Sequence, residues 1–353
     1  MKKELVKIFQ VATVFIGTIV GAGLASGKEI TSFFTQYGIY SFLGIISCGI
    51  FYIIMSSIIS KISIDYNLNS YSDVITIISP NILGKFTGFI TTLFLISSAS
   101  IILAGSGSLL HQFFGIPKII GSLIMILIAI FFLLRGTEGL IEVNSFIVPG
   151  LIGTLTLITV LYFVFCRDTV SFSNISSFPP QRSGLVISTI LYAGYNTLSA
   201  SGVLVPLSNQ MRKTKTMIIG VIVGATGLTI LSLMINLLLT VNQPYIYKYE
   251  IPLLFVANRF GNLVQALLLV IIWLEMFSTE VSDIYSISKT LEQIFDIKFK
   301  KVIFIVLGVA LLISQFGFGN LITKLYPMFG LLSLIFIAQC LVFFFKNKKY
   351  SSK

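Results

Sequence analysis

The chain has 353 residues, of which 56% are hydrophobic and 10% are charged, and its mean hydropathy is +0.98. A soluble globular domain carries roughly 25% charged residues, so this composition excludes a soluble enzyme, a nucleic-acid-binding protein and a disordered chain. Cys48, Cys166 and Cys340 lie far apart, in or at the end of apolar runs. That spacing matches neither a disulfide framework nor a metal site. The composition indicates an all-α polytopic membrane protein.

Ten apolar runs are long enough to be transmembrane helices, which need about 20 mostly apolar residues. They cover residues 8–36, 38–60, 83–110, 117–134, 138–166, 184–207, 216–240, 262–287, 300–316 and 319–346. The first run is long, glycine-interrupted and followed directly by another, so it is not a cleavable signal peptide. The segment Ile251–Phe260 is expected to be a short helix in an outer loop.

The positions of the basic residues predict the topology. With the N-terminus inside, 17 of the 24 lysines and arginines fall on cytoplasmic segments and 5 on outer segments, which is the positive-inside bias. An even number of spans places both termini in the cytoplasm. The net charge of +11 is therefore mostly a topology signal. It predicts the lipid bilayer as a partner and no nucleic acid.

The chain also shows signs of an internal repeat within one transmembrane domain over residues 1–353. Five spans occupy residues 8–166 and five occupy 184–346, and an odd number of spans per half requires the second half to be inverted. The first span of each half has a cluster of small residues, over 17–27 and 193–202, and Ala-Ser-Gly occurs at 25–27 and 200–202. The clusters predict two broken helices, in spans 1 and 6; close helix packing is the alternative.

The segment Val20-Gly-Ala-Gly-Leu-Ala-Ser-Gly-Lys-Glu29, followed by Phe33-Phe34, resembles the start of the YkvI-like bacterial membrane proteins. These belong with the amino acid–polyamine–organocation (APC) transporter superfamily, which has the LeuT-type fold. The resemblance implies a 5+5 inverted repeat in the bacterial inner membrane. It also implies a substrate held between spans 1, 3, 6 and 8, and coupling to Na⁺ or H⁺.

The two expected breaks form the candidate substrate site. The half-helix after Gly23 would present free N–H groups and a positive dipole end to a carboxylate, and freed carbonyls would suit an ammonium group. A zwitterion, hence an amino acid or a related amine, is the leading substrate class. The candidate residues are Val20, Gly21, Ala22, Gly23, Ala193, Gly194, Tyr195 and Asn196. An ordinary packed aromatic is the alternative for Tyr195.

Span 8 carries the candidate ion-coupling site. Glu275, Ser278 and Thr279 share one helical face, and ionisable residues at membrane depth are costly and usually functional. The resemblance implies that the Ser278–Thr279 hydroxyls join the carbonyls of Gly17 and Val20 around Na⁺; hydroxyls bonded to their own helix are the alternative. Glu275 is the proton-carrier candidate. Glu280 and Asp283 are expected to be hydrated at the inner boundary.

A candidate outer gate is the ion pair Glu29–Lys324, since a LeuT-type arrangement brings their half-spans together above the substrate. The alternative is that each side chain reaches water separately. The chain shows no catalytic motif, so it is not predicted to be an enzyme, and it needs no cofactor other than Na⁺ or H⁺ as coupling ion. The predicted function is an ion-coupled secondary transporter. The alternative is an amino-acid-sensing receptor subunit that binds without transport.

Overall fold

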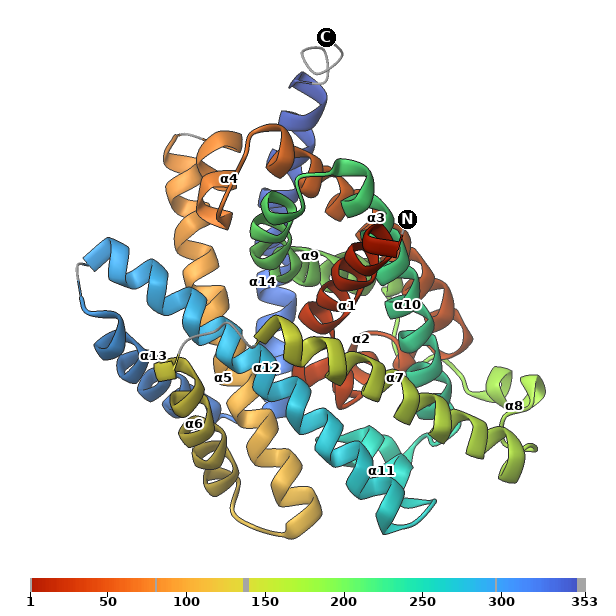
Figure 1. The fold of residues 1–353 in the computed structure, drawn as a ribbon. Coiled ribbons are helices and arrows are strands. Elements are labelled where there is room, and N and C mark those ends of the chain that lie inside the picture. Colours follow the sequence, from red (N-terminus) through yellow and green to blue (C-terminus); the bar gives the residue numbers. More distant parts are fainter. Residues whose placement is uncertain (1, 80, 136–139, 296, 348–353) are drawn as a thin grey trace.

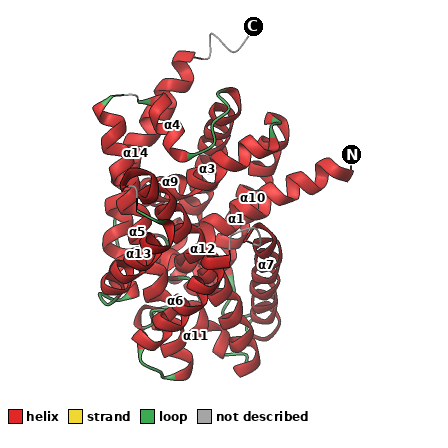
Figure 2. Cartoon of the chain, turned by 60° about the vertical axis from the view of Figure 1, so that its left-hand side comes forward, coloured by secondary structure: helices red, strands yellow, loops and turns green. Residues whose placement is uncertain are grey.

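The computed structural model describes residues 2–79, 81–135, 140–295 and 297–347, and within these ranges all regular structure is helical (Figures 1 and 2). The long helices are α1 (Lys2–Ala25), α3 (Ser41–Asp65), α5 (Ile82–Phe114), α6 (Lys118–Arg135), α7 (Leu140–Phe165), α9 (Leu185–Met211), α10 (Thr214–Thr240), α12 (Asn262–Phe295), α13 (Phe299–Ser314) and α14 (Phe318–Asn347). The short ones are α2 (Lys28–Phe33), η1 (Thr35–Tyr40), α4 (Tyr71–Ile78), α8 (Phe172–Ser177), η2 (Tyr245–Lys248) and α11 (Pro252–Asn258). The short helix expected near Ile251–Phe260 is confirmed as α11.

Among the described residues, seven helical segments are long and apolar enough to cross a membrane. They are Glu4–Ala25, Thr35–Asp65, Ile82–Phe114, Ile147–Phe165, Thr214–Thr240, Asn262–Ser288 and Phe318–Asn347, and Lys118–Leu134 is apolar but shorter. The chain is thus a multi-pass membrane protein, while the count of ten spans stays a prediction. The expected start of the fifth span, residue 138, lies outside the described residues.

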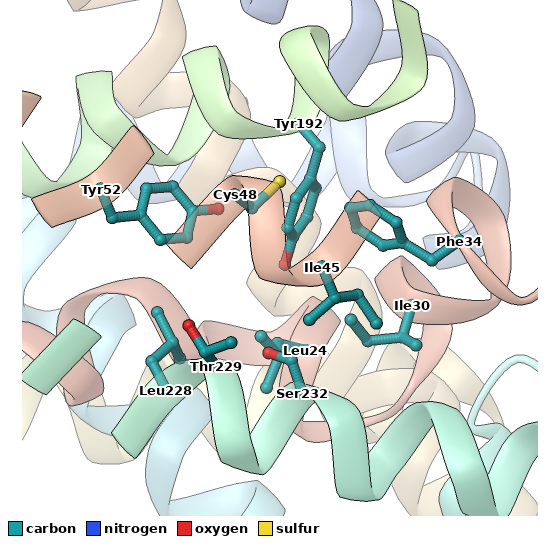
Figure 3. Close-up of a pocket in the computed structure, with 10 residues that line it drawn as sticks. All are labelled: Leu24, Ile30, Phe34, Ile45, Cys48, Tyr52, Tyr192, Leu228, Thr229 and Ser232. Carbon is teal, nitrogen blue, oxygen red and sulfur yellow. The ribbon is translucent and has the colours of Figure 1, made fainter. Parts of the chain in front are cut away.

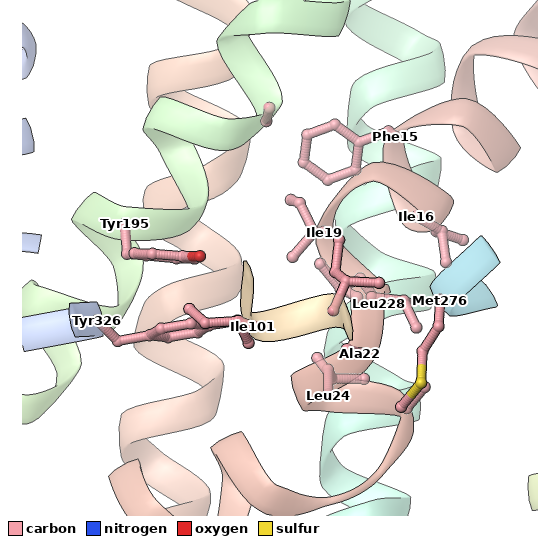
Figure 4. Packing of buried hydrophobic residues seen from close by; sticks show 14 of the residues in the cluster. Phe15, Ile16, Ile19, Ala22, Leu24, Ile101, Tyr195, Leu228, Met276 and Tyr326 are labelled. Atoms are coloured by element: carbon pink, nitrogen blue, oxygen red, sulfur yellow. The ribbon is translucent and has the colours of Figure 1, made fainter. Parts of the chain in front are cut away.

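Helix α1 lies at the centre of the bundle, where it packs against α7, α9, α10 and α12. From Val11 to Ala25 its apolar side chains are almost completely buried, for example Phe15 and Ile19 (Figure 4). Large apolar side chains of peripheral helices point outward instead, including Leu127 on α6 and Phe165 at the end of α7. An apolar outer surface of this kind suits contact with lipid.

The helix contacts come in matched pairs. The contact of α1 with α10 corresponds to that of α9 with α3. The contact of α5 with α6 corresponds to that of α12 with α13. Likewise α7 packs on α12 as α14 packs on α5, and α1 packs on α7 as α9 packs on α14. Exchanging α1, α3, α5, α6 and α7 with α9, α10, α12, α13 and α14, in that order, therefore maps each of these contacts onto another one, whereas the contact of α1 with α12 has no counterpart of comparable extent among the described residues.

The two ends of the bundle are distinct. The C-terminal end of α14 extends from one end, and α11 lies at the opposite end in both views (Figures 1 and 2). Helix α4 lies near the α14 end, where a capping box formed by Ser70 and Asp73 fixes its start. Such reciprocal side-chain bonds satisfy two backbone N–H groups that the first helical turn leaves free.

Candidate functional site

The first long helix is interrupted where the glycine cluster predicts it. Gly21 has φ 41° and ψ −162°, outside the helical region, and α1 ends at Ala25. Gly27, with φ 80°, then precedes α2. Positive φ values are accessible to glycine at little cost because it has no Cβ. The glycines at 21 and 27 therefore allow the backbone to turn twice inside what would otherwise be one span.

Glu29, in the first turn of α2, lies at the centre of this region with only 1% of its surface exposed. Its carboxylate accepts a hydrogen bond from the Tyr192 hydroxyl on α9 at 2.7 Å and one from the Tyr326 hydroxyl on α14 at 2.5 Å. A Cβ at Gly23 would overlap this carboxylate. One buried acidic group thus joins α1, α2, α9 and α14.

Aromatic rings surround that carboxylate. The Phe33 ring lies 5.3 Å from the ring of Tyr192 and 6.0 Å from that of Tyr326, centroid to centroid. Tyr195 stacks on Tyr326 at 3.6 Å with an interplanar angle of 15° (Figure 4). Such ring pairs contribute about 0.5–1.5 kcal/mol each beyond their buried area. We call Glu29, Phe33, Tyr192, Tyr195 and Tyr326 the Glu29 cluster.

A small cavity of about 10 Å³ adjoins the cluster, with Tyr192 in its wall (Figure 3). It is lined by Leu24, Ile30, Phe34, Ile45, Cys48, Tyr52, Tyr192, Leu228, Thr229 and Ser232. The Asn196 side-chain amide donates to the Tyr52 hydroxyl at 3.1 Å and to the Tyr192 carbonyl at 3.2 Å. This volume is about that needed by one water molecule, so a substrate requires the helices to move apart.

The predicted break in span 6 is not observed. Helix α9 runs continuously from Leu185 to Met211, and the Ala193 carbonyl accepts a hydrogen bond from the Thr197 hydroxyl at 2.8 Å. Gly194 serves close packing, because a Cβ there would lie 2.5 Å from the Ser333 hydroxyl and 3.0 Å from the Gly330 carbonyl. The small residues of α9 thus let α14 approach, which is the small-residue packing common in membrane helices.

The other predicted substrate residues divide between the two helices. Val20, Ala22 and Gly23 are buried in α1, whereas Gly21 is half-buried. The structure brings Tyr195 into the Glu29 cluster. It places the Asn196 amide against Tyr52 and the backbone of Tyr192, at the edge of the cluster.

The predicted ion pair between Glu29 and Lys324 is wrong for this structure. Lys324 is exposed, and the α14 side chain that reaches Glu29 is Tyr326. Two residues correspond to about 200° of rotation on a helix with 3.6 residues per turn. When Tyr326 faces the bundle interior, Lys324 therefore faces away from it. The neighbouring Lys28 instead donates to the Tyr249 carbonyl at 3.1 Å.

Helix α12 bears the predicted ion-coupling side chains and packs against α1, which carries the buried Gly17 and Val20. The Thr279 hydroxyl donates to the Glu275 carbonyl at 3.0 Å, and the Ser282 hydroxyl donates to the Ser278 carbonyl at 2.9 Å. Hydroxyl groups bonded to their own helix are common in membrane proteins. In this structure the Thr279 hydroxyl is thus engaged with α12 itself.

Buried carboxyl groups are the unusual feature of α12. Glu275 and Glu280 are both 0% exposed, and none of their four carboxylate oxygens has a hydrogen-bond partner among the described residues. An unpaired buried polar group costs about 1–3 kcal/mol, and more when it is charged. The expectation that Glu280 is hydrated at a boundary is therefore wrong, because neighbouring helices cover this side of α12. Asp283 is half-buried.

The segment between α10 and α12 covers the interruption of the first helix. The backbone N–H of Leu253 in α11 donates to the Ser26 carbonyl at 3.0 Å. Gln112 at the end of α5 exchanges two hydrogen bonds with the backbone of Ile251, at 2.9 and 3.1 Å. A Cβ at Gly27 would lie 2.8 Å from the Leu253 side chain. Helix α11 is thus fastened directly over the turn that leads to Glu29.

An ion pair between Lys118 and Glu250 also holds the segment between α10 and α12. The Lys118 ammonium lies 2.6 Å from the Glu250 carboxylate, and both side chains are partly exposed. Partial burial disfavours the charged carboxylate, but Lys118, Ser108 and the positive charge of Lys28 together outweigh it and hold the pKa of Glu250 below its usual value. The pair is therefore formed near neutral pH.

Comparison with known proteins identifies the family. No protein-family model matches the chain. The chain is 31% identical over 332 residues to the membrane protein YkvI of Bacillus subtilis (strain 168), covering 94% of each protein. The chain belongs to the YkvI family. A second B. subtilis protein, YyaD, is 24% identical to this YkvI-family chain over 329 residues, covering 93% of the chain and 94% of YyaD.

Solved structures identify the fold of this YkvI-family protein. MhsT in complex with L-phenylalanine matches with a TM-score of 0.70, over 94% of this chain and 87% of MhsT, at 15% identity. The inward-facing conformation of Mhp1 matches with a TM-score of 0.65, over 92% and 73%, at 14% identity. A Na⁺-coupled sialic acid symporter matches with a TM-score of 0.66, over 93% and 75%, at 18% identity. The YkvI-family chain therefore has the LeuT-type fold.

Sequence reasoning missed Tyr192, Tyr326 and Tyr52 as members of this site. Tyr192 has the i, i+3 and i, i+4 relationship to Tyr195 and Asn196, so one face of a predicted helix contains all three. That spacing could have added Tyr192. Neither Tyr326 nor Tyr52 has a comparable local signal, because both meet the site through contacts between helices far apart in the sequence.

Proposed function

We propose that this YkvI-family protein is a secondary active transporter of a small amino acid or related amine. It works by alternating access and is coupled to Na⁺ or H⁺. The observation that carries the proposal is the Glu29 cluster, a buried polar group at the interruption of the central helix of a LeuT-type fold. Irregular backbone at membrane depth is tolerated where it is buried in protein or lines a cavity, and binding sites of secondary transporters lie at such interruptions.

The arrangement proposed is ten spans in two inverted five-helix halves, residues 8–166 and 184–346, with both termini in the cytoplasm. The matched helix contacts support it, since exchanging the helices of one half with those of the other maps four pairs of contacts onto each other. The positive-inside bias supports the orientation. The resemblance in fold also supports the proposed membership of the APC superfamily.

The proposed substrate side comprises residues 20–23 of α1 with Tyr195 and Asn196 of α9. The proposed ion side comprises the carbonyls of Gly17 and Val20 with Ser278 and Thr279 for Na⁺, or the Glu275 carboxyl for H⁺. The packing of α1 on α12 supports the first possibility. The burial of Glu275 without a partner supports the second.

The test begins with thermal unfolding of the purified protein against amino acids and amines, in Na⁺ or K⁺, at two pH values. A ligand at 100 times its Kd stabilises the folded state by about 2.7 kcal/mol. The ligand found is then offered to proteoliposomes with an imposed Na⁺ or pH gradient. Uptake that collapses with the gradient is expected. A ligand that stabilises the protein but is not taken up, with either gradient, would contradict transport and indicate a receptor.

A further inference from the structure

The carboxylate of Glu29 lies beside Gly23, at the position that the sequence predicts for the carboxylate of a zwitterionic substrate. It occupies the space next to Gly23, at the start of the second part of the interrupted span. The nearby N–H groups are engaged as well: that of Ser26 with the Ala22 carbonyl at 3.1 Å, and that of Gly27 with the Leu24 carbonyl at 2.9 Å. The N–H of Lys28 is likewise bonded to the Ser26 hydroxyl at 3.2 Å, so none of these three amides is free to bind a second anion.

Glu29 itself lacks a cationic partner in the parts of the chain that the structure describes. The ion pairs found there are Lys118–Glu250 and Lys213–Glu4. Lys28, the nearest lysine in sequence, directs its ammonium to the Tyr249 carbonyl. A buried carboxylate is stabilised either by a positive charge or by protonation. The two tyrosine hydroxyls use two of the roughly four acceptor positions of a carboxylate, so acceptor capacity remains for a bound cation.

The surrounding rings suit an organic cation. The Phe33 ring lies within 6.0 Å of the rings of Tyr192 and Tyr326, centroid to centroid, and Tyr195 stacks on Tyr326. Aromatic faces attract an ammonium group through the ring quadrupole, and cages of several rings recognise substituted ammonium ions. A hard metal ion such as Ca²⁺ takes about 6–8 oxygen ligands, more than the Glu29 carboxylate and the two tyrosine hydroxyls bonded to it supply.

Building on the proposed transport function, we propose that the Glu29 cluster recognises the ammonium group of a small organic amine. The transported substrate is then a cation without a carboxylate rather than a zwitterionic amino acid. A substrate carboxylate placed here would be repelled by Glu29, and this repulsion is strong where little water screens it. The same feature that disfavours amino acids thus favours their decarboxylated amines.

Matched triplets of probes test the substrate class on the unmodified protein. Each triplet is an amino acid, its decarboxylated amine and its deaminated acid: alanine, ethylamine and propionate; leucine, isoamylamine and 4-methylpentanoate; phenylalanine, phenethylamine and 3-phenylpropionate. Thermal stabilisation is measured at matched concentration and constant NaCl. We expect at least one amine to bind about tenfold or more tightly than its amino acid, a difference of about 1.4 kcal/mol. An amino acid that binds as well as its amine, or better, overturns the proposal.

Variants then test the role of Glu29 in amine binding. Glu29→Gln keeps the shape of the side chain and should weaken amine binding by about tenfold or more, while Glu4→Gln, at an exposed site, should not. Tyr326→Phe keeps the ring and should weaken it less. Equal amine binding by Glu29→Gln and the wild type, or Glu29-dependent stabilisation by NaCl alone, overturns the proposal. If Glu29→Gln does not fold, the probe triplets on the wild type decide. Amine binding without uptake instead contradicts transport and leaves this assignment intact.

Discussion

The carboxylate of Glu29 occupies the space that a side chain at Gly23 would fill, so these two residues are in direct contact across the interruption of the first span. Glycine is needed at position 23 for this approach, because any Cβ there overlaps the carboxylate. The hydrogen bonds from Tyr192 and Tyr326 hold the carboxylate in that place. The interruption and the buried acid therefore form one structural unit.

Gly23→Ala is expected to displace the Glu29 carboxylate and to disrupt its bonds to the two tyrosines. Overpacking of this kind costs about 1–3 kcal/mol, and ligand binding should fall with it. Gly202→Ala is the matched control, because a Cβ on this α9 glycine meets no atom within 4 Å. Thermal unfolding and ligand-induced stabilisation of both variants measure the effect. Equal behaviour of the two variants would contradict the contact.

Glu275→Gln is expected to abolish transport or to uncouple it from the ion gradient. The side chain is fully buried and its oxygens have no hydrogen-bond partner among the described residues, and such groups in membrane helices are usually functional. The measurement is uptake into proteoliposomes as a function of pH and Na⁺, with a fall of about tenfold or more expected. Transport with unchanged rate, affinity and pH dependence would remove Glu275 from the mechanism.

Gly330→Ala is expected to destabilise the crossing of α9 and α14. A Cβ at Gly330 would overlap the carbonyl of Leu191, and backbone atoms cannot move aside as a flexible side chain can. The expected loss is about 1–3 kcal/mol. Gly308→Ala on α13, where a Cβ meets nothing within 4 Å, should leave stability unchanged or raise it by up to about 1 kcal/mol. Thermal unfolding in the same detergent compares the two, and a stable Gly330→Ala protein would contradict the tight crossing.

The Lys118–Glu250 ion pair, which holds the segment leading into α11, is expected to contribute stability that depends on pH. The pKa of Glu250 is held below its ordinary value of 4.5, because Lys118, with smaller contributions from Ser108 and Lys28, outweighs the partial burial of the carboxylate. A depressed pKa contributes stability that is present above pH 4.5 and lost as the pH falls through the lowered value. Since both partners are partly exposed, we expect at most about 1 kcal/mol.

The measurement for this pair is the difference in thermal unfolding between the wild type and Glu250→Gln, across a pH series. We expect the wild type to be more stable at neutral pH and the difference to vanish in acid. Lys118→Met should give the same loss at neutral pH. A difference that persists at the lowest pH would show that the pair does not contribute through charge.

The helices could be predicted from the sequence because each depends on a local property. A run of apolar residues long enough to cross a bilayer forms a helix that satisfies its own backbone hydrogen bonds, so the positions of α5, α10 and α14 follow from such runs. Gly21 and Gly27 likewise mark the interruption of the first span, because only glycine adopts their backbone angles at little cost. The resemblance to the YkvI family came from the same short segment.

The partners of the site residues were decided by the tertiary structure. Sequence reasoning chose the correct helix for the partner of Glu29 but chose Lys324 instead of Tyr326, since the rotation of a helix about its axis is set by its packing against other helices. It also expected a break in α9, where the small residues around Gly194 instead let α14 approach. Apolar length and backbone angles are properties of a single segment. Which side chain meets a buried carboxylate depends on how distant segments pack, and the order of residues along one helix does not contain that information.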